Sequence, residues 1–339
     1  MMNSKTINLS SLLIYLFSIT QVAKRTILSE TLEYSPWSFS ELLISYPDQF
    51  IRRGLIGETI QIIAGDTVLF DTVNLFVFIN FVIFTLLSFT FIKLSKLSSI
   101  QHFLYLISIF GILNVSMFNQ YFHRKEMFVL NLFLIILLTL RFRANEYLIL
   151  LISSICSILM ILIHEGIAMI TIPFIVYLFK KMLDNSKKVL YVYTPIVLLI
   201  FLTVIISSGS DSSSNVIWEN LSEFDKNQIV INPNAITAIG WSLLDSFLNT
   251  TQILIFSGSM FLWTFYFFIV GFTLFVIFNI NLNKIYIDYS KVKSFLVKEK
   301  YFLVIPVLFV IGFDWGRWLF SLFHLCFFSY LTLKENTII

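Results

Sequence analysis

Charged residues are scarce in this sequence, and so is cysteine. Only 13% of its 339 residues are Asp, Glu, Lys or Arg, about half the proportion found in soluble domains. Hydrophobic residues make up 58% of the chain, and the mean hydropathy is +0.87. These values exclude an ordinary soluble domain. They predict an all-α, polytopic integral membrane protein.

The two cysteines, Cys156 and Cys326, both lie within apolar runs. Thiols in such surroundings are usually inert packing residues, so no disulfide is expected. The charged segments also contain no H-x-x-x-H, C-x-x-C or D-x-D pattern, which are the spacings that commonly indicate a metal site. We therefore expect neither a metal nor a cofactor.

Ten apolar runs have the regular spacing of transmembrane helices. The first, Leu9 to Ile19, follows a weakly charged segment and lacks a small-x-small cleavage signal, so a membrane helix is favoured over a signal peptide. The others are about the length needed to cross roughly 30 Å of hydrocarbon. They lie near 74–92, 100–118, 127–140, 147–163, 167–179, 189–207, 253–280, 301–313 and 319–333. The pair covering 147–179 is also compatible with one long buried hairpin.

Positive charges divide unevenly between the two faces that ten spans create. One face receives fifteen of the 23 Lys and Arg residues, and the other receives eight. By the positive-inside rule the first face is cytoplasmic. Both termini are therefore expected on the cytoplasmic side of a bacterial inner membrane. The acidic residues have the opposite bias, with five inside and fifteen outside. The net charge of +3 therefore reflects topology, and no nucleic-acid partner is expected.

The chain is expected to form a single transmembrane domain, residues 1–339, with a first outer loop at about 23–73 and a large outer loop at about 208–252. Two interfacial helices are expected in the first loop. A Ser-Pro dipeptide at 35–36, with capping-box spacing between Ser38 and Glu41, predicts a short helix.

The predicted short helix covers Trp37 to Ser45, and a second amphipathic segment should end near Ala64. Between them, Tyr46 to Glu58 reads Y-P-D-Q-F-I-R-R-G-L-I-G-E. This segment carries Asp48, Arg52 and Arg53, and its glycines permit close approach of backbone or ligand. Asp48 follows a proline and is a candidate N-cap. Taken alone, an interfacial helix with solvated charges would explain the segment.

Three further charged clusters lie at the same predicted outer face. In chain order they are His123-Arg124-Lys125-Glu126, His164-Glu165 and Asp314-x-x-Arg317-Trp318. An ionisable pair within the apolar stretch 147–179 is costly, so His164 and Glu165 indicate function. For the other clusters, snorkelling anchors, a local ion pair between Asp314 and Arg317, and aromatic-belt residues remain open.

Together the clusters indicate an anion-binding site. Positive-inside selection removes Arg and Lys from outer segments unless something retains them. Helices that run inward begin at this face with their positive dipole ends, which would assist Arg124 and Arg317 in binding a diphosphate. Asp48 and Glu165 are then candidate general bases, able to deprotonate a hydroxyl.

This pattern resembles the lipid-carrier-dependent GT-C-type glycosyltransferases and, more closely, bacterial O-antigen and capsule repeat-unit polymerases. The resemblance rests on the many spans, an inward N-terminus, an acid in the first outer loop, and outer arginines. Its possible motifs are Asp48-x-x-x-Arg52-Arg53-Gly54 and the three later clusters. Typical polymerases have two large arginine-rich outer loops, whereas the loop at 208–252 has no Arg. GT-C enzymes often have two adjacent acids, and Asp48 has no acidic neighbour.

The resemblance implies a membrane enzyme that transfers a glycan from an undecaprenyl-diphosphate donor to a sugar hydroxyl at the periplasmic face, in O-antigen or capsule assembly. Its partners would be the lipid-linked oligosaccharide, membrane lipid and other polysaccharide assembly proteins. Arg52, Arg53, Arg124 and Arg317 would hold the diphosphate as leaving group. The remaining candidate contacts to diphosphate or glycan are His123, Lys125, Glu126, His164, Asp314 and Trp318.

Three alternatives remain open at this point. One is a transferase that uses a lipid-phosphate sugar and adds a single residue. Another is a transporter or flippase of a lipid-linked glycan, which would need a polar pathway across the midplane and often shows inverted repeats. The third is a structural subunit of a polysaccharide assembly complex.

The predicted topology can be tested with reporter fusions. A reporter after Ser212, in the large outer loop, and one after Asn283, on the basic face, should report opposite compartments because of the asymmetry of positive charge. If both reporters gave the same compartment, the outer site would be excluded together with the topology.

Overall fold

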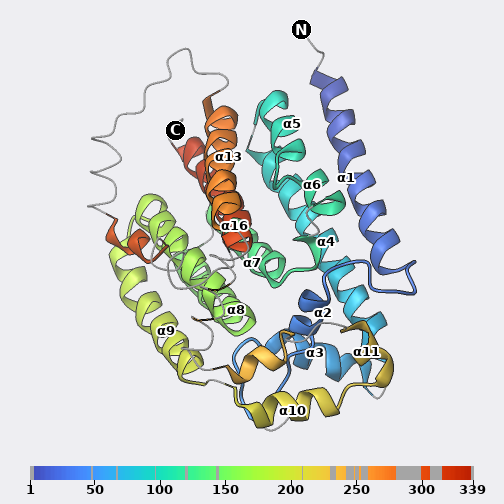
Figure 1. The fold of residues 1–339 in the computed structure, drawn as a ribbon. Coiled ribbons are helices and arrows are strands. Elements are labelled where there is room, and N and C mark those ends of the chain that lie inside the picture. Colours follow the sequence, from blue (N-terminus) through green and yellow to red (C-terminus); the bar gives the residue numbers. More distant parts are fainter. Residues whose placement is uncertain are drawn as a thin grey trace.

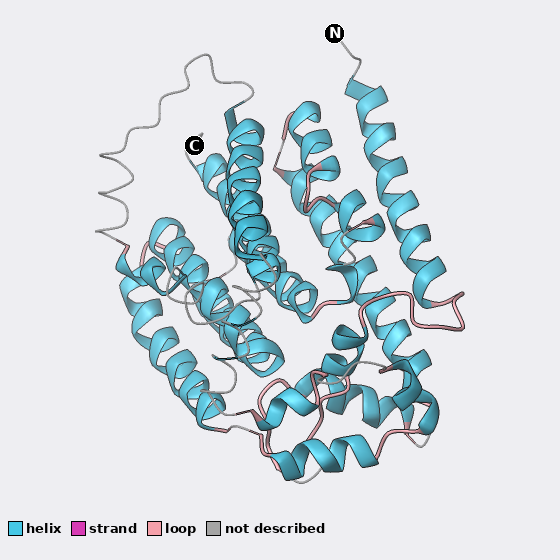
Figure 2. Cartoon of the chain, viewed as in Figure 1, coloured by secondary structure: helices cyan, strands magenta, loops and turns pink. Residues whose placement is uncertain are grey.

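The computed structural model describes residues 4–46, 49–65, 68–95, 97–118, 121–142, 145–207, 209–229, 234–241, 259–279, 299–305 and 315–336, with the single residues Leu248 and Gln252. Within these ranges every regular element is helical (Figure 2). The prediction of an all-α protein is therefore confirmed.

The described helices follow one another along the chain. They are α1 (Ser4–Thr26), α2 (Pro36–Leu42), α3 (Leu55–Ala64), α4 (Leu69–Leu94), α5 (Ser99–Ile107), α6 (Ile112–Met117), α7 (Lys125–Arg141), α8 (Glu146–Met182), α9 (Ser186–Ile206), α10 (Asp211–Glu219), α11 (Glu223–Gln228), α13 (Ser259–Asn279) and α16 (Trp315–Asn336), with 3-10 turns η1 (Tyr121–His123), η2 (Thr237–Gly240) and η3 (Lys300–Leu303). The long helices form a bundle, and the short helices α2, α3, α10 and α11 gather at one end of it (Figure 1). The start of α1 and the end of α16 lie at the other end.

Four helices of the described part are long and apolar enough to cross a membrane. They are Leu69–Leu94, the α5–α6 segment Ser99–Met117, Glu146–Met182 and Ser186–Ile206. Helices α1, α7, α13 and α16 overlap four other predicted runs. The run predicted at 301–313 lies mostly outside the described residues. Membrane-spanning character is thus supported for part of the predicted set, while the count of ten spans stays a prediction.

Helix α8 reverses direction at His164. That residue has φ −163° and ψ 97°, outside the helical region. The Glu146 carboxylate, at the start of α8, accepts hydrogen bonds from the backbone N–H and the side chain of Asn185, just beyond its end, at 3.2 and 3.0 Å. A straight helix of 37 residues would separate its ends by about 55 Å. The two halves are therefore antiparallel, as the hairpin prediction for 147–179 requires.

Helices α5 and α6 form one span that is broken at 108–111. A Cβ on Gly111 would lie 2.1 Å from the Tyr105 carbonyl oxygen, so only glycine fits there. The break frees backbone carbonyls within an apolar region, where they need partners. The Asn114 amide donates to the carbonyls of Ile107 and Ser108 at 2.9 and 2.8 Å, which satisfies them locally.

Buried polar contacts attach the two loops that were predicted to lie outside to the end of the bundle where α2, α3, α10 and α11 gather. The Asp225 carboxylate is fully buried and accepts the first backbone N–H groups of α4, from Leu69 and Phe70, at 3.2 and 2.9 Å. The Ser40 hydroxyl in α2 accepts the N–H of Ala235 at 3.0 Å. The large loop therefore supports both α4 and α2 from the same side.

The predicted start of the first interfacial helix is confirmed, but its predicted capping is wrong. Proline lies in the first turn of α2, yet Ser35 makes no side-chain capping hydrogen bond. Glu41 does not complete a capping box, because its carboxylate is engaged with a distant arginine. Helix α3 ends at Ala64 as predicted, although its N-cap position is Gly54. Asp48 lies outside the described residues.

The break between α5 and α6 gives a stability prediction. Gly111→Ala should destabilise the detergent-solubilised protein by about 2 kcal/mol or more, since the new methyl group collides with two backbone carbonyls. Gly271→Ala is the matched control, because no atom lies within 4 Å of its Cβ position in α13; alanine there should be neutral or stabilising. Equal melting temperatures for the two variants would contradict the tight break.

Candidate functional site

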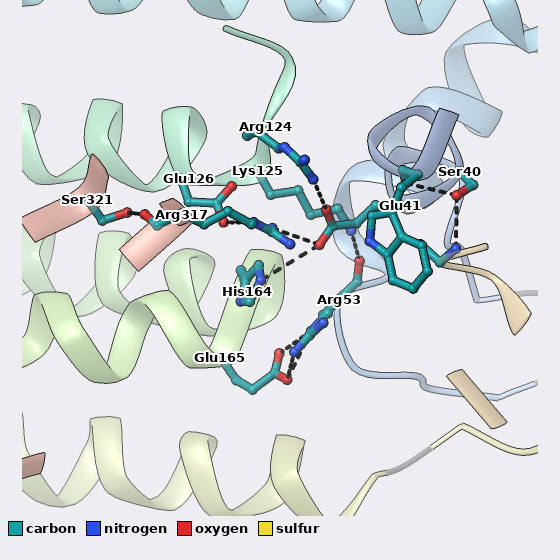
Figure 3. Close-up of polar contacts among 12 residues, drawn as sticks. Ser40, Glu41, Arg53, Arg124, Lys125, Glu126, His164, Glu165, Arg317 and Ser321 are labelled. Carbon is teal, nitrogen blue, oxygen red and sulfur yellow. Dashed lines mark hydrogen bonds and ion pairs between the residues drawn. The ribbon is translucent and has the colours of Figure 1, made fainter. Parts of the chain in front are cut away.

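Residues from five separate segments meet beside α2 (Figure 3). Each of the four charged clusters contributes at least one of them, and α2 adds Glu41. The residues are Glu41, Arg52, Arg53, Arg124, Lys125, Glu126, His164, Glu165 and Arg317; we call them the charge cluster. The structure therefore brings described residues of all four charged clusters together, while their binding role stays a prediction. Asp48 and Asp314 lie outside the described residues.

Glu41 occupies the centre of the charge cluster and is only 2% exposed. Its Oε1 atom accepts a hydrogen bond from Arg317 Nη2 at 3.0 Å. The Nη1 atom of Arg124 lies 4.0 Å from its other oxygen, and the His164 Nε2 atom lies 3.7 Å from Oε1. The sequence analysis did not identify Glu41 as a site residue. An acid within the buried run F-S-E-L-L-I was the available signal.

Arg317 connects three helices through two carboxylates. It extends from α16 to Glu41 in α2, and its Nε atom also donates to Glu126 Oε1 at the start of α7 (Figure 3). Arg317 is 4% exposed and Glu126 is fully buried. Removing one member of such a buried group typically leaves an uncompensated charge that costs several kcal/mol, about 3–5. Arg317 therefore has a structural role in addition to any role in binding.

Arg53 has an unusual backbone conformation, and contacts to both its carbonyl oxygen and its guanidinium group stabilise it. Its backbone has φ 67°, the left-handed region that non-glycine residues rarely adopt. The Lys125 ammonium donates to its carbonyl oxygen at 2.6 Å. Its guanidinium donates from Nε to both oxygens of Glu165 at 3.0 Å, and Nη2 lies 2.8 Å from Oε1. Strained residues of this kind persist where the surroundings fix them, and they cluster at functional sites.

Packing explains the two glycines that follow Arg53. A Cβ on Gly54 would lie 2.1 Å from the Tyr46 ring, and one on Gly57 would lie 2.0 Å from the Ile44 carbonyl oxygen. Close approach was predicted here for backbone or ligand, and the structure shows approach by the protein itself. The glycines let α3 pack tightly against the segment before Arg53.

Positive charge exceeds negative charge in the charge cluster. Four arginines and one lysine face three glutamates, an excess of two among the described residues. Burial alone would raise the pKa of Glu41, but Arg317, Lys125, Arg53 and Arg124 outweigh it and lower that pKa to about 2. Glu41 is therefore ionised at physiological pH and is a weak base.

Several buried polar atoms in the charge cluster have no hydrogen-bond partner among the described residues. They are Oε2 of Glu41, Oε2 of Glu126 and both ring nitrogens of His164. Buried groups of this kind usually cost about 1–3 kcal/mol each, so each needs an explanation. A polar ligand that donates and accepts hydrogen bonds would supply one.

Two predicted site residues lie beside the charge cluster rather than in its ion pairs. His123 stacks on the Tyr34 ring, with centroids 4.6 Å apart. Burial lowers the pKa of His123 well below its usual value, and Arg124, Arg317 and Arg25 lower it further, so the ring is neutral. Trp318 is 7% exposed and belongs to the hydrophobic core. Both residues support the helices that position the arginines.

The donor set of the charge cluster favours an anion over a metal ion. Within the described ranges, no group of three or more His, Cys, Asp or Glu side chains is arranged to hold a metal. The cations would also repel a metal ion. An oxyanion, in contrast, would meet guanidinium groups in the forked geometry that suits phosphate.

No family model, curated protein or solved structure matches this chain.

The central position of Glu41 gives a second stability prediction. Glu41→Gln should destabilise the solubilised protein by about 3–5 kcal/mol, because it leaves buried cations without their partner. The control is Glu33→Gln, at an exposed acid in the same loop, which should change stability by less than about 0.5 kcal/mol.

The loss of stability in acid provides a second test of the ion pairs of Glu41. Because the folded pKa of about 2 lies below the ordinary value of 4.5, the stabilisation from this carboxylate is present above pH 4.5 and is lost as the pH falls towards 2. The wild-type protein should lose stability across that window, and Glu41→Gln should lose correspondingly less. Identical acid-unfolding curves for the two proteins would contradict this role.

Proposed function

We propose that this protein is a membrane glycosyltransferase or polymerase. It transfers a glycan from an undecaprenyl-diphosphate donor to a sugar hydroxyl at the periplasmic face of a bacterial inner membrane, in O-antigen or capsule assembly, with both termini cytoplasmic. The observation that carries this proposal is the excess of two positive charges among the described residues of the charge cluster. A diphosphate would offset that excess.

The arginines divide into an inner and an outer set. Arg317 has a side chain that is 5% exposed, whereas Arg52, Arg53 and Arg124 have side chains that are 25%, 32% and 20% exposed. An arriving anion would therefore meet Arg52, Arg53 and Arg124 first. Their charge would stabilise the negative charge that develops on the diphosphate as it leaves.

An apolar cavity begins one helical turn from Glu165 and would suit part of the lipid chain of the donor. The cavity has a volume of about 410 Å³ and lies between α8 and α9. On α8 it begins at Met169, one turn beyond Glu165, the partner of Arg53. Helix α9 ends at Ile206, and the next residue, Ser207, accepts a hydrogen bond from the N–H of Arg52 at 3.3 Å. The charged and apolar portions of one lipid diphosphate could thus bind side by side.

The contacts of Glu165 make it a poorer candidate for the general base than the sequence indicated. Both carboxylate oxygens of Glu165 accept hydrogen bonds from Arg53, which favours the ionised form and weakens it as a base. In the proposed enzyme Glu165 positions Arg53. Asp48 keeps its predicted role as a base candidate and lies outside the described residues.

Transport of a lipid-linked glycan is the second candidate, because one span is broken. Discontinuous helices are common in transporters, and α5–α6 is interrupted at 108–111. The carbonyls freed there are bonded to Asn114 within the same segment. This arrangement stabilises the break without presenting polar groups to a substrate, so the enzyme remains the favoured function.

Conservative arginine substitutions test the proposed diphosphate site. In a strain deleted for the gene, Arg52→Lys or Arg53→Lys should keep the charge but lose the planar fork. The length of surface polysaccharide should therefore fall sharply, by about tenfold or more, at normal protein level. Arg141→Lys is the matched control, since Arg141 lies at the other end of α7 and bonds Ser95.

Two outcomes would contradict the proposal. Full-length polysaccharide in the deletion strain would exclude a polymerase. Full-length polysaccharide from both lysine variants would exclude binding of the diphosphate by these arginines. Accumulation of untransported lipid-linked units on the cytoplasmic side would instead support transport.

A further inference from the structure

We infer that His164 is the general base of the proposed transfer and that Glu41 is its positioning residue. This inference rests on the proposed function and assigns the proton acceptor within the same site. It replaces Glu165 in that role and names a histidine that the sequence analysis had placed only among the substrate contacts.

The first observation is the position of His164 in the fold. It is the residue at which α8 reverses, with φ −163° and ψ 97° between two helical halves. The ring is therefore placed at the end of two helices and next to α2, where Glu41 and Arg317 meet (Figure 3). A side chain fixed by two helices and a buried neighbour is pre-organised for catalysis.

The second observation is that both ring nitrogens of His164 are free of hydrogen bonds within the described part of the chain, although the residue is only 3% exposed. A neutral imidazole has one donor and one acceptor nitrogen. Leaving both unused in a buried site is unfavourable. A substrate hydroxyl that donates to one nitrogen would satisfy it.

The third observation separates the roles of the two nitrogens. Nε2 lies 3.7 Å from Glu41 Oε1, a separation that a small shift would convert into a hydrogen bond. With its proton on Nε2, directed at Glu41, the ring presents Nδ1 as the acceptor. The carboxylate then fixes the tautomer and stabilises the imidazolium that forms during the reaction.

The fourth observation is that residue 166, which lies beside Nδ1, has no side chain. A Cβ on Gly166 would lie 3.5 Å from Nδ1 and 3.4 Å from Cε1 of His164. Glycine therefore keeps its own side chain out of the position next to Nδ1. In the proposed site His164 accepts the proton, Glu165 holds Arg53, and Gly166 adds no bulk beside the accepting nitrogen.

In the proposed step the acceptor hydroxyl transfers its proton to His164 Nδ1, and the oxygen electron pair forms the new bond to the anomeric carbon of the donor sugar. The bond from that carbon to the diphosphate oxygen breaks, and its electron pair leaves on the diphosphate. Arg52 and Arg53 stabilise the departing charge.

The bound donor would also make the proton transfer easier. In the absence of an anion, the imidazolium would add another positive charge to a site whose described residues already carry an excess of two. A diphosphate offsets this excess, so His164 can accept a proton once the donor is bound. Catalysis would thus depend on donor binding.

His164→Gln is the main test, because glutamine keeps hydrogen-bonding capacity but cannot accept the proton. We expect polysaccharide synthesis in the complemented deletion strain to fall about 100-fold or more. Binding of inorganic pyrophosphate to the purified variant in lipid nanodiscs should stay within about threefold of wild type. His102→Gln is the control, since His102 bonds Tyr15 outside the charge cluster, and it should retain activity.

Gly166→Ala is the second test and remains informative if His164→Gln does not fold. Its methyl group makes ordinary contacts, so the protein should fold and bind pyrophosphate, but activity should fall about tenfold because the approach to Nδ1 is narrowed. Activity of either variant within twofold of wild type would overturn the assignment of the base. Failure of the wild-type protein to bind pyrophosphate would instead overturn the proposed function.

Discussion

A charge that is removed from water inside a protein must be paired, and this constraint organises the end of the bundle where α2 and α3 lie. Arg317 satisfies it by bonding Glu41 and Glu126 at once. The three residues belong to α16, α2 and α7, which are far apart in the chain. The position of the interfacial helix α2 is therefore set by an ion pair as well as by the apolar residues packed around it. Any change that displaces α2 also exposes or unpairs a buried charge.

The backbone features of the site follow from the same constraint. Arg53 can place its guanidinium on Glu165 only if the chain turns sharply before α3, and its φ of 67° provides that turn. Lys125 holds the strained carbonyl at 2.6 Å, while Gly54 and Gly57 allow the turn to pack. The reversal of α8 at His164 brings Glu165 to the same place. Strain in one segment is thus offset by pairing in another.

The sequence was informative where a physical signal is local. Apolar runs predicted helices, and ionisable residues within such runs predicted the segments that converge. Glu41 was missed because its spacing from Ser38 matches a capping box, whereas its partner Arg317 lies 276 positions away. No local pattern carries that pairing. The antiparallel halves of α8 were predicted because two runs of spanning length surround a charged tip. The capping of α2 was wrong because a tertiary ion pair outweighed a local hydrogen bond.

The strengths of the pairings suggest how one site can be both stable and reactive. Arg317 has close carboxylate partners in Glu41 and Glu126, and these contacts hold the helices together without any ligand. Arg52 Nη1 lies 3.9 Å from Glu165 Oε1, a separation longer than a hydrogen bond. Arg52 can therefore turn to an anion without breaking the ion pairs of Arg317. A site that used the same arginines for both tasks would lose stability each time its product left. The separation of structural and binding cations is therefore a physical reason for the excess of positive charge.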